Sequence, residues 1–212
     1  MRYQAMDMLS SVYRDIGNEE KAFEYIRMLP DQMQGDAIEH LYERGTEKWW
    51  SSVRRNIYQM SEDLYIKIRN CGLFAKTNEE AIRILSKAID FIKLIYDEND
   101  FGFSNYHLGE LYIWLAGRYS YEKDYESCAE NLDLGLSYAK AYDELPETTI
   151  HSSFLIEGCL FKCSDVNSGY EYNFVKKHLI FVGKNRFFNR VRNEQWFMDI
   201  IEKYTPFAKD SK

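Results

Sequence analysis

Residues 9–26, LSSVYRDIGNEEKAFEYI, and residues 115–132, LAGRYSYEKDYESCAENL, carry side chains of the same kind at the same spacing. In the first half of each copy, a leucine is followed directly by a small residue and, one helical turn later, by a tyrosine. A short polar stretch comes next, and the second half of each copy then carries a small residue and, one turn later, an aliphatic residue. The matched positions are Leu9, Tyr13, Ala22 and Ile26, and Leu115, Tyr119, Cys128 and Leu132. A small residue lets two helices approach closely, and the aromatic ring fills the space above it. The repetition therefore predicts two helical hairpins.

The region between the two copies also predicts helices. Within residues 50–71 an apolar residue returns every three or four positions, which is typical of one face of a long helix. Thr77 and Glu80 have the spacing of a capping box, so another helix is expected to begin there. Residues 81–88 fit the second helix of the repeat, but Gly72 stands where the first helix should carry its tyrosine. We therefore expect a third, partial hairpin.

The repeated pattern resembles the tetratricopeptide repeat, whose first helix carries leucine, a small residue and tyrosine. Residues 1–30 and 108–142 match it clearly. The resemblance implies an all-α fold in which helical hairpins stack into an α-solenoid, or superhelix. On this basis residues 1–146 are expected to be degenerate repeats, and residues 147–212 helices that cap the same array. Within the cap, HLIFV at 178–182 could be either a strand or a helix end.

Four stretches together resemble the repeat domain of bacterial helix-turn-helix transcriptional regulators of the Xre type. They are LSSVYRDIGNEEKA (9–22), IKIRN (66–70), AYDELPE (141–147) and FNRVRNEQWFMDII (188–201). In that family a DNA-binding domain precedes the repeats, and the repeats dimerise and sense a peptide, a protein or a small ligand. Because the first repeat helix begins at once, we expect either the C-terminal part of such a regulator or a stand-alone adaptor.

The resemblance also indicates where a ligand would bind. In the family's arrangement the first helix of each hairpin lines a concave face. Counting from the two leucines, and adding the partial hairpin, selects the candidate groove residues Asp7, Arg14, Asp63, Asn70, Glu110 and Ile113. These side chains are expected to contact a peptide or protein ligand. The alternative is that they are ordinary solvated helix positions.

Composition narrows the class of protein. The chain has 212 residues, 45% of them hydrophobic, and three prolines, which is typical of one globular domain built from long elements. A net charge of −7 does not favour phosphate binding by the whole chain, so DNA would be bound only through a domain absent from it. No signal peptide and no apolar run long enough for a bilayer is evident. We therefore expect a cytoplasmic protein, a homodimer in the regulator hypothesis, with no membrane partner.

Motifs for metal binding and catalysis are incomplete. His151, Cys159 and Cys163 could share a zinc ion, but no fourth ligand is near, and reduced core thiols are the alternative. Residues 97–108 begin like a calcium-binding loop, yet a phenylalanine and a leucine occupy ligand positions. No phosphate loop, dinucleotide fingerprint or nucleophile motif occurs. We therefore expect no metal, no cofactor and no enzymatic activity.

One segment has an unusual charge. Residues 172–193 contain no acidic side chain and six basic ones, interleaved with phenylalanines. The basic residues are Lys176, Lys177, Lys184, Arg186, Arg190 and Arg192. Such a segment could contact single-stranded nucleic acid. The alternative, which we favour at this point, is that it folds onto the acidic repeats and covers the open apolar end of the array.

Overall fold

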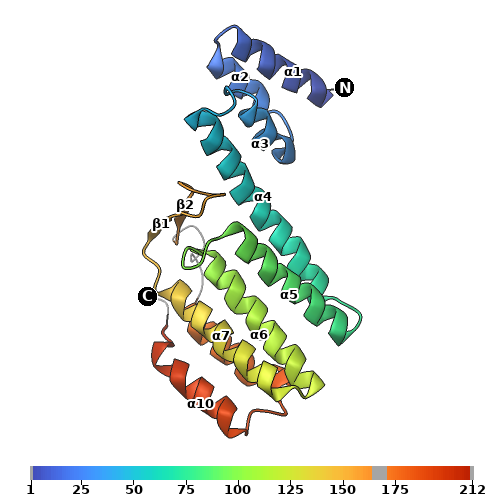
Figure 1. Ribbon diagram of the computed structural model, residues 1–212, viewed down its shortest axis with the longest axis vertical. Coiled ribbons are helices and arrows are strands. Elements are labelled where there is room, and N and C mark those ends of the chain that lie inside the picture. The colour runs from blue at the N-terminus through green and yellow to red at the C-terminus, as the bar shows by residue number, and fades with distance from the viewer. Residues whose placement is uncertain (1, 164–170, 211–212) are drawn as a thin grey trace. The chain divides into compact units, whose positions relative to one another are not determined.

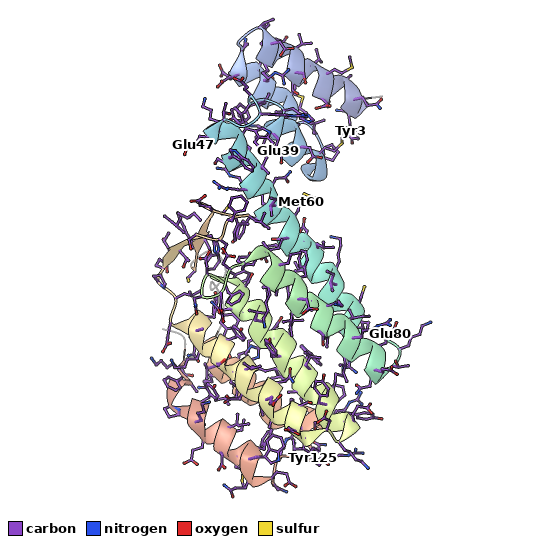
Figure 2. All side chains as sticks on the ribbon, viewed as in Figure 1. Tyr3, Glu39, Glu47, Met60, Glu80 and Tyr125 are labelled. Carbon is purple, nitrogen blue, oxygen red and sulfur yellow. The ribbon has the colours of Figure 1, made fainter. Side chains whose placement is uncertain are left out.

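The computed structural model describes residues 2–163 and 171–210, and these residues are mostly helical (Figure 1). This confirms the predicted helical class. The chain divides into two compact units. Unit 1 consists of the residues up to Met60 together with Leu155–Cys159, and unit 2 of Ser61–Phe154 and the described residues from Leu160 onward. The division falls inside the long helix α4 (Glu47–Leu73), on which Figure 2 labels Met60.

Unit 1 begins with the first predicted hairpin, formed by α1 (Arg2–Asp15) and α2 (Glu19–Ile26). Gly17 in the turn has a φ of +77°, a backbone conformation that costs glycine little because it has no Cβ. Asn18 begins α2, because its side-chain oxygen accepts a hydrogen bond from the backbone N of Lys21 at 3.1 Å. The polar break in the repeat is thus a turn followed by a helix cap.

A third helix, α3 (Asp31–Glu39), follows Pro30, and no sequence pattern above predicts it. It packs on α2 around Ile26, Leu29 and Ala37, which are nearly inaccessible to solvent. The N-terminal part of α4 completes unit 1, and Asn56 on it donates hydrogen bonds to carboxylates of α3.

Unit 2 contains the remainder of α4 and, after a tight turn, α5 (Asn78–Ile95). The predicted Thr77 cap is present, since the Thr77 hydroxyl accepts a hydrogen bond from the backbone N of Glu80 at 3.1 Å. The Glu80 carboxylate reaches back as well, but it accepts from the backbone N of Lys76 at 3.2 Å, one residue before the position that a capping box uses. Near the end of α4, a Cβ placed on Gly72 would lie 2.8 Å from Leu85 Cδ2. The glycine at the position expected for tyrosine therefore lets α4 and α5 approach closely.

The second predicted hairpin is formed by α6 (Ser104–Glu122) and α7 (Tyr125–Asp143). The two helices cross at a pair of glycines. A Cβ on Gly109 would lie 3.1 Å from the carbonyl oxygen of Gly135, and a Cβ on Gly135 would lie 2.6 Å from Ile113 Cγ1. With no side chain on either glycine, the helix backbones come close enough to touch.

The residues after α7 include a short antiparallel pair of strands, β1 (Thr148–Ile150) and β2 (Leu160–Lys162). These strands correct the expectation of helices throughout residues 147–212. Each has three residues, which is too short for a recognisable alternation of apolar and polar side chains. Residues 164–170 and 211–212 of this expected cap lie outside the described part of the chain.

The C-terminal part of unit 2 is helical, as expected. Its elements are α9 (Phe174–Lys184), the short 3-10 helices η1 (Arg186–Phe188) and η2 (Thr205–Phe207), and α10 (Gln195–Tyr204). The ambiguous stretch 178–182 lies inside α9 and is therefore helical rather than a strand.

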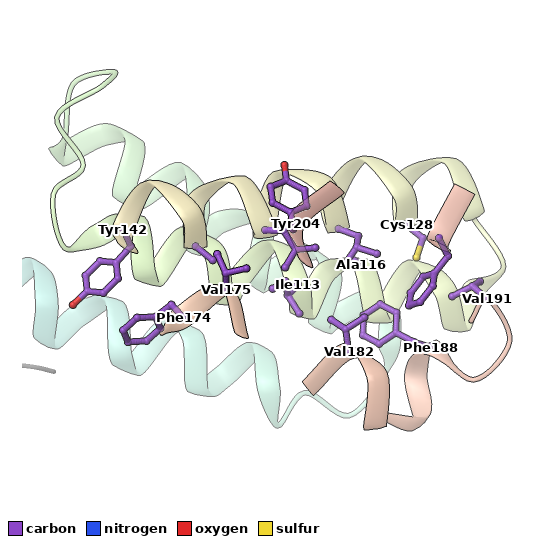
Figure 3. Close-up of a cluster of buried hydrophobic side chains, with 14 of the residues drawn as sticks. Ile113, Ala116, Cys128, Tyr142, Phe174, Val175, Val182, Phe188, Val191 and Tyr204 are labelled. Atoms are coloured by element: carbon purple, nitrogen blue, oxygen red, sulfur yellow. The ribbon is translucent and has the colours of Figure 1, made fainter. Parts of the chain in front are cut away.

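The core of unit 2 lies where α9, η1 and α10 close onto the α6/α7 hairpin (Figure 3). Buried side chains from all of these elements contribute to it, among them Ile113, Ala116, Cys128, Phe174, Val182, Phe188 and Tyr204. The carboxylate of Asp143, at the end of α7, accepts hydrogen bonds from the backbone N of Phe174 and of Val175, both at 2.9 Å. This contact links the end of the hairpin to the start of α9.

Candidate functional site

Charged and polar side chains from three helices of unit 2 form two neighbouring hydrogen-bonded groups, which together we call the polar strip. Its members are Glu62 and Arg69 on α4, Tyr106, His107 and Glu110 on α6, and Lys177 on α9. Sequence separations between bonded partners on different helices range from 41 to 71 residues. The strip therefore exists only because these helices lie side by side.

At one end of the strip, the carboxylate of Glu62 on α4 meets the imidazole of His107 on α6. His107 Nε2 lies 2.7 Å from Glu62 Oε2, and the other carboxylate oxygen accepts a hydrogen bond from the Tyr96 hydroxyl at 3.2 Å. His107 is 5% exposed, whereas the Glu62 side chain keeps 24% of its surface exposed. The carboxylate is thus held in place and still reaches solvent.

The rest of the strip connects α4 to α9 through Glu110. Arg69 Nη1 donates to Glu110 Oε2 at 3.2 Å, and the Tyr106 hydroxyl donates to Glu110 Oε1 at 2.9 Å. Lys177 Nζ in turn donates to the Tyr106 oxygen at 3.1 Å. The Arg69 and Glu110 side chains are 24% and 17% exposed, so this ion pair is half-buried.

Tyr65, Lys177 and His178 are ionisable groups in or next to the strip that have lost much of their contact with water. Tyr65 is 1% exposed, and its ring centroid lies 3.9 Å from that of His107. Burial raises the pKa of Tyr65 far above its usual value and lowers the pKa of Lys177 below its usual value. Burial also lowers the pKa of His178 to about 4. Charges at the strip are therefore only partly screened by water, and hydrogen bonds to them are stronger than on an open surface.

An aromatic pair lies one helical turn beyond the strip on both α6 and α9. Trp114 follows Glu110 by four residues, Phe181 follows Lys177 by four, and their ring centroids are 5.1 Å apart. Both side chains are half-buried. The face made by α6 and α9 thus offers charges of both signs next to an apolar platform.

The structure distributes the six predicted groove residues over both units. Asp7 and Arg14 belong to unit 1, where Arg14 is occupied by Asp15 and by the carbonyl oxygen of His40. Asp7 and Arg14 thus belong to a different unit from the other four predicted residues.

Of the four predicted residues in unit 2, Glu110 is a member of the polar strip. Asn70 is exposed and accepts a hydrogen bond from Arg69 Nη2 at 3.2 Å, and Asp63 is exposed on α4. The prediction that Ile113 lines the groove is wrong, because Ile113 is 1% exposed and packs into the core where α6 crosses α7 at Gly135. Counting from a leucine identified the correct helix, but α7 covers that side of it.

Sequence reasoning missed most of the strip. Glu62 and Arg69 are seven residues apart, and Tyr106 and Glu110 four, so each pair lies on one helical face. This spacing was available as a signal of a polar face. Nothing in it indicated that α4, α6 and α9 bring these faces together with Lys177.

Two of the three residues considered for zinc, His151 and Cys163, have other partners. His151 Nδ1 lies 3.1 Å from the carbonyl oxygen of Asp100, and Cys163 Sγ donates to the carbonyl oxygen of Pro146 at 3.3 Å. The Asp100 carboxylate, in the calcium-like loop, accepts from the backbone N of Ser152 at 2.8 Å and thereby fixes the chain after β1. Within residues 2–163 and 171–210, no three His, Cys, Asp or Glu side chains are grouped so that they could hold a metal ion.

Comparison with known proteins gives no relative. The chain matches no protein-family model, no curated protein and no solved structure. Among the helices of the described residues, none combines the length and the apolar character needed to cross a membrane.

Proposed function

We propose that this chain is a non-enzymatic module that binds a peptide or a segment of another protein on the face formed by α4, α6 and α9. The observation that carries the proposal is the polar strip, in which helices far apart in sequence meet through Arg69–Glu110 and Lys177–Tyr106. These helices alternate along the chain with α5 and α7. In stacked helical hairpins the first helices line one common face, and a tetratricopeptide-like arrangement of unit 2 would make α4, α6 and α9 those first helices.

The chemistry of the face suits a polypeptide. Partly exposed carboxylates and cations can each bond a side chain or backbone group of a ligand, and a hydrogen bond to a charged group contributes about 1.5–3 kcal/mol. The Trp114–Phe181 pair next to them can bury an apolar side chain of the same ligand. A ligand that uses both regions must extend along the helices, as a peptide segment does.

The wider role that we propose is the sensory and dimerisation part of a transcriptional regulator. It rests on the resemblance of residues 9–22, 66–70, 141–147 and 188–201 to repeat domains of Xre-type regulators. In that role the chain forms a homodimer and reaches DNA only through a domain outside this sequence. Light scattering on the purified chain tests the first point, and a monomer at all accessible concentrations would contradict it.

The binding proposal is tested by selecting peptides from a random display library on the purified chain. The selected peptide is then titrated against Arg69→Gln, Glu110→Gln and Lys177→Gln. We expect each variant to weaken binding by about tenfold or more, since each removes one charged hydrogen-bonding group. Lys87→Gln is the matched control, because Lys87 is an exposed cation on α5 that pairs with its neighbour Asp90 and does not belong to the polar strip.

Two results would contradict the proposal. One is that no peptide is selected, and the other is that the selected peptide binds the three strip variants as tightly as it binds Lys87→Gln. Circular dichroism of each variant establishes that a loss of binding is not a loss of fold.

A further inference from the structure

Two cations of the basic segment, Arg186 and Arg190, are not paired with acidic side chains in the described part of the chain. The segment packs on the α6/α7 hairpin, as the favoured interpretation expects, but mainly through apolar side chains such as Phe174, Val182 and Phe188. Lys176 pairs with Asp210, near the end of the chain. Within the described residues, Arg186 and Arg190 form no ion pair. Their charges are therefore available to an external anion.

These two arginines line a pocket at the C-terminal end of α6. Its volume is about 380 Å³, and it is lined by Tyr121, Arg186, Phe187, Asn189 and Arg190. None of these residues is acidic. Nearby in sequence, the carboxylate of Glu122 accepts a hydrogen bond from Asn78, and that of Asp124 caps α7 through Ser127. Both acidic groups thus already have partners outside the pocket.

Each of the two cations lies near an aromatic ring. The Arg190 guanidinium lies 5.8 Å from the Tyr121 ring centroid, and its Nη1 donates to the Tyr121 carbonyl oxygen at 3.4 Å. The Arg186 guanidinium lies 5.9 Å from the ring centroid of Phe187. The two rings are 6.4 Å apart and nearly perpendicular, and Tyr121 is 57% exposed. The pocket thus combines two positioned guanidinium groups with an accessible aromatic surface.

We propose that this pocket binds a mononucleotide, with the phosphate on Arg186 and Arg190 and the base against Tyr121. The planar guanidinium group presents paired N–H donors that match two oxygens of a phosphate. Every nucleobase has a flat face that can stack on an aromatic side chain. The volume exceeds that of a phosphate ion and falls within the range of about 300–1,000 Å³ found for small-molecule sites. The site is separate from the polar strip, so it stands or falls independently of peptide binding.

Calorimetric titration of the full chain with AMP, adenosine and inorganic phosphate tests the proposal. We expect saturable binding of AMP, with adenosine and phosphate each weaker by about tenfold or more, since each lacks one half of the contact. Arg186→Gln should weaken AMP binding by about tenfold or more. This variant keeps the fold testable, because no hydrogen bond of the Arg186 side chain contributes to the described structure.

Lys184→Gln is the matched control, since Lys184 is an exposed cation of the same segment that does not line the pocket. It should bind AMP as the unaltered chain does. The proposal is overturned if AMP shows no saturable binding, if adenosine binds as tightly as AMP, or if Arg186→Gln and Lys184→Gln bind AMP equally well.

Discussion

Gly135 provides the sharpest test of how the α6/α7 hairpin packs. The change Gly135→Ala adds one methyl group, which would lie 2.6 Å from Ile113 Cγ1, 3.0 Å from Ile113 N and 3.1 Å from the carbonyl oxygen of Gly109. The isoleucine side chain is 1% exposed and has little space to move into. The other two atoms are backbone, so they can move only if α6 and α7 separate.

The expected loss of stability follows from two opposing effects. Alanine is favoured over glycine by about 0.5–1 kcal/mol in the interior of a helix. Overpacking of a well-packed core costs about 1–3 kcal/mol, and the contacts with backbone place this site at the upper end of that range or beyond. We therefore expect a net decrease of about 2 kcal/mol in the free energy of unfolding. For a chain of this length this corresponds to a decrease of about 4–8 °C in Tm.

The matched control is Gly183→Ala in the last turn of α9, where an added Cβ would have no atom within 4 Å. Its stability should be unchanged or increased by up to about 1 kcal/mol. Thermal and urea unfolding of both variants, followed by circular dichroism, provides the comparison. If Gly135→Ala unfolds at or above the Tm of the unaltered chain, α6 and α7 do not cross at these glycines.

Four further outcomes are expected. Burial lowers the pKa of His178 to about 4, below its unfolded value of 6.5. The free energy of unfolding should therefore fall by about 3 kcal/mol as the pH decreases from 6.5 to about 4, because the unfolded chain binds a proton first. His178→Gln should remove this dependence in unfolding experiments at different pH values. Thr77→Ala should cost about 1 kcal/mol in urea unfolding, because α5 loses its cap. Asp143→Ala should cost about 2 kcal/mol or more in the same assay, since two amides at the start of α9 lose their acceptor. With a thiol reagent at neutral pH, the exposed Cys71 should react in the folded chain. Cys128 should react only on unfolding, because the folded chain makes its thiol inaccessible and burial raises the pKa of that thiol to about 12.

The amino-acid sequence by itself determined the local structure of this protein. The spacing shared by residues 9–26 and 115–132 predicted both hairpins, and Ala22 and Cys128, its small positions, are fully buried. The Thr77 cap was also predictable. Helical periodicity and capping involve residues within a few positions of one another, so they can be recognised without knowledge of the fold. The strands β1 and β2 were missed because three residues are too few to show a period.

Only the tertiary structure decided which helix faces meet. Glu62, Arg69 and Lys177 were not among the predicted groove residues, and Ile113, which was, lies in the core. A helical pattern shows that a face is polar or apolar. It does not specify which neighbouring helix covers that face, or at which position along the helix the two make contact. Those are set by the crossing of α6 and α7 at Gly109 and Gly135, and by the packing of α4 and α9 against α6. The contacts that create the polar strip join residues 41 to 71 positions apart, and no local regularity of the chain encodes them.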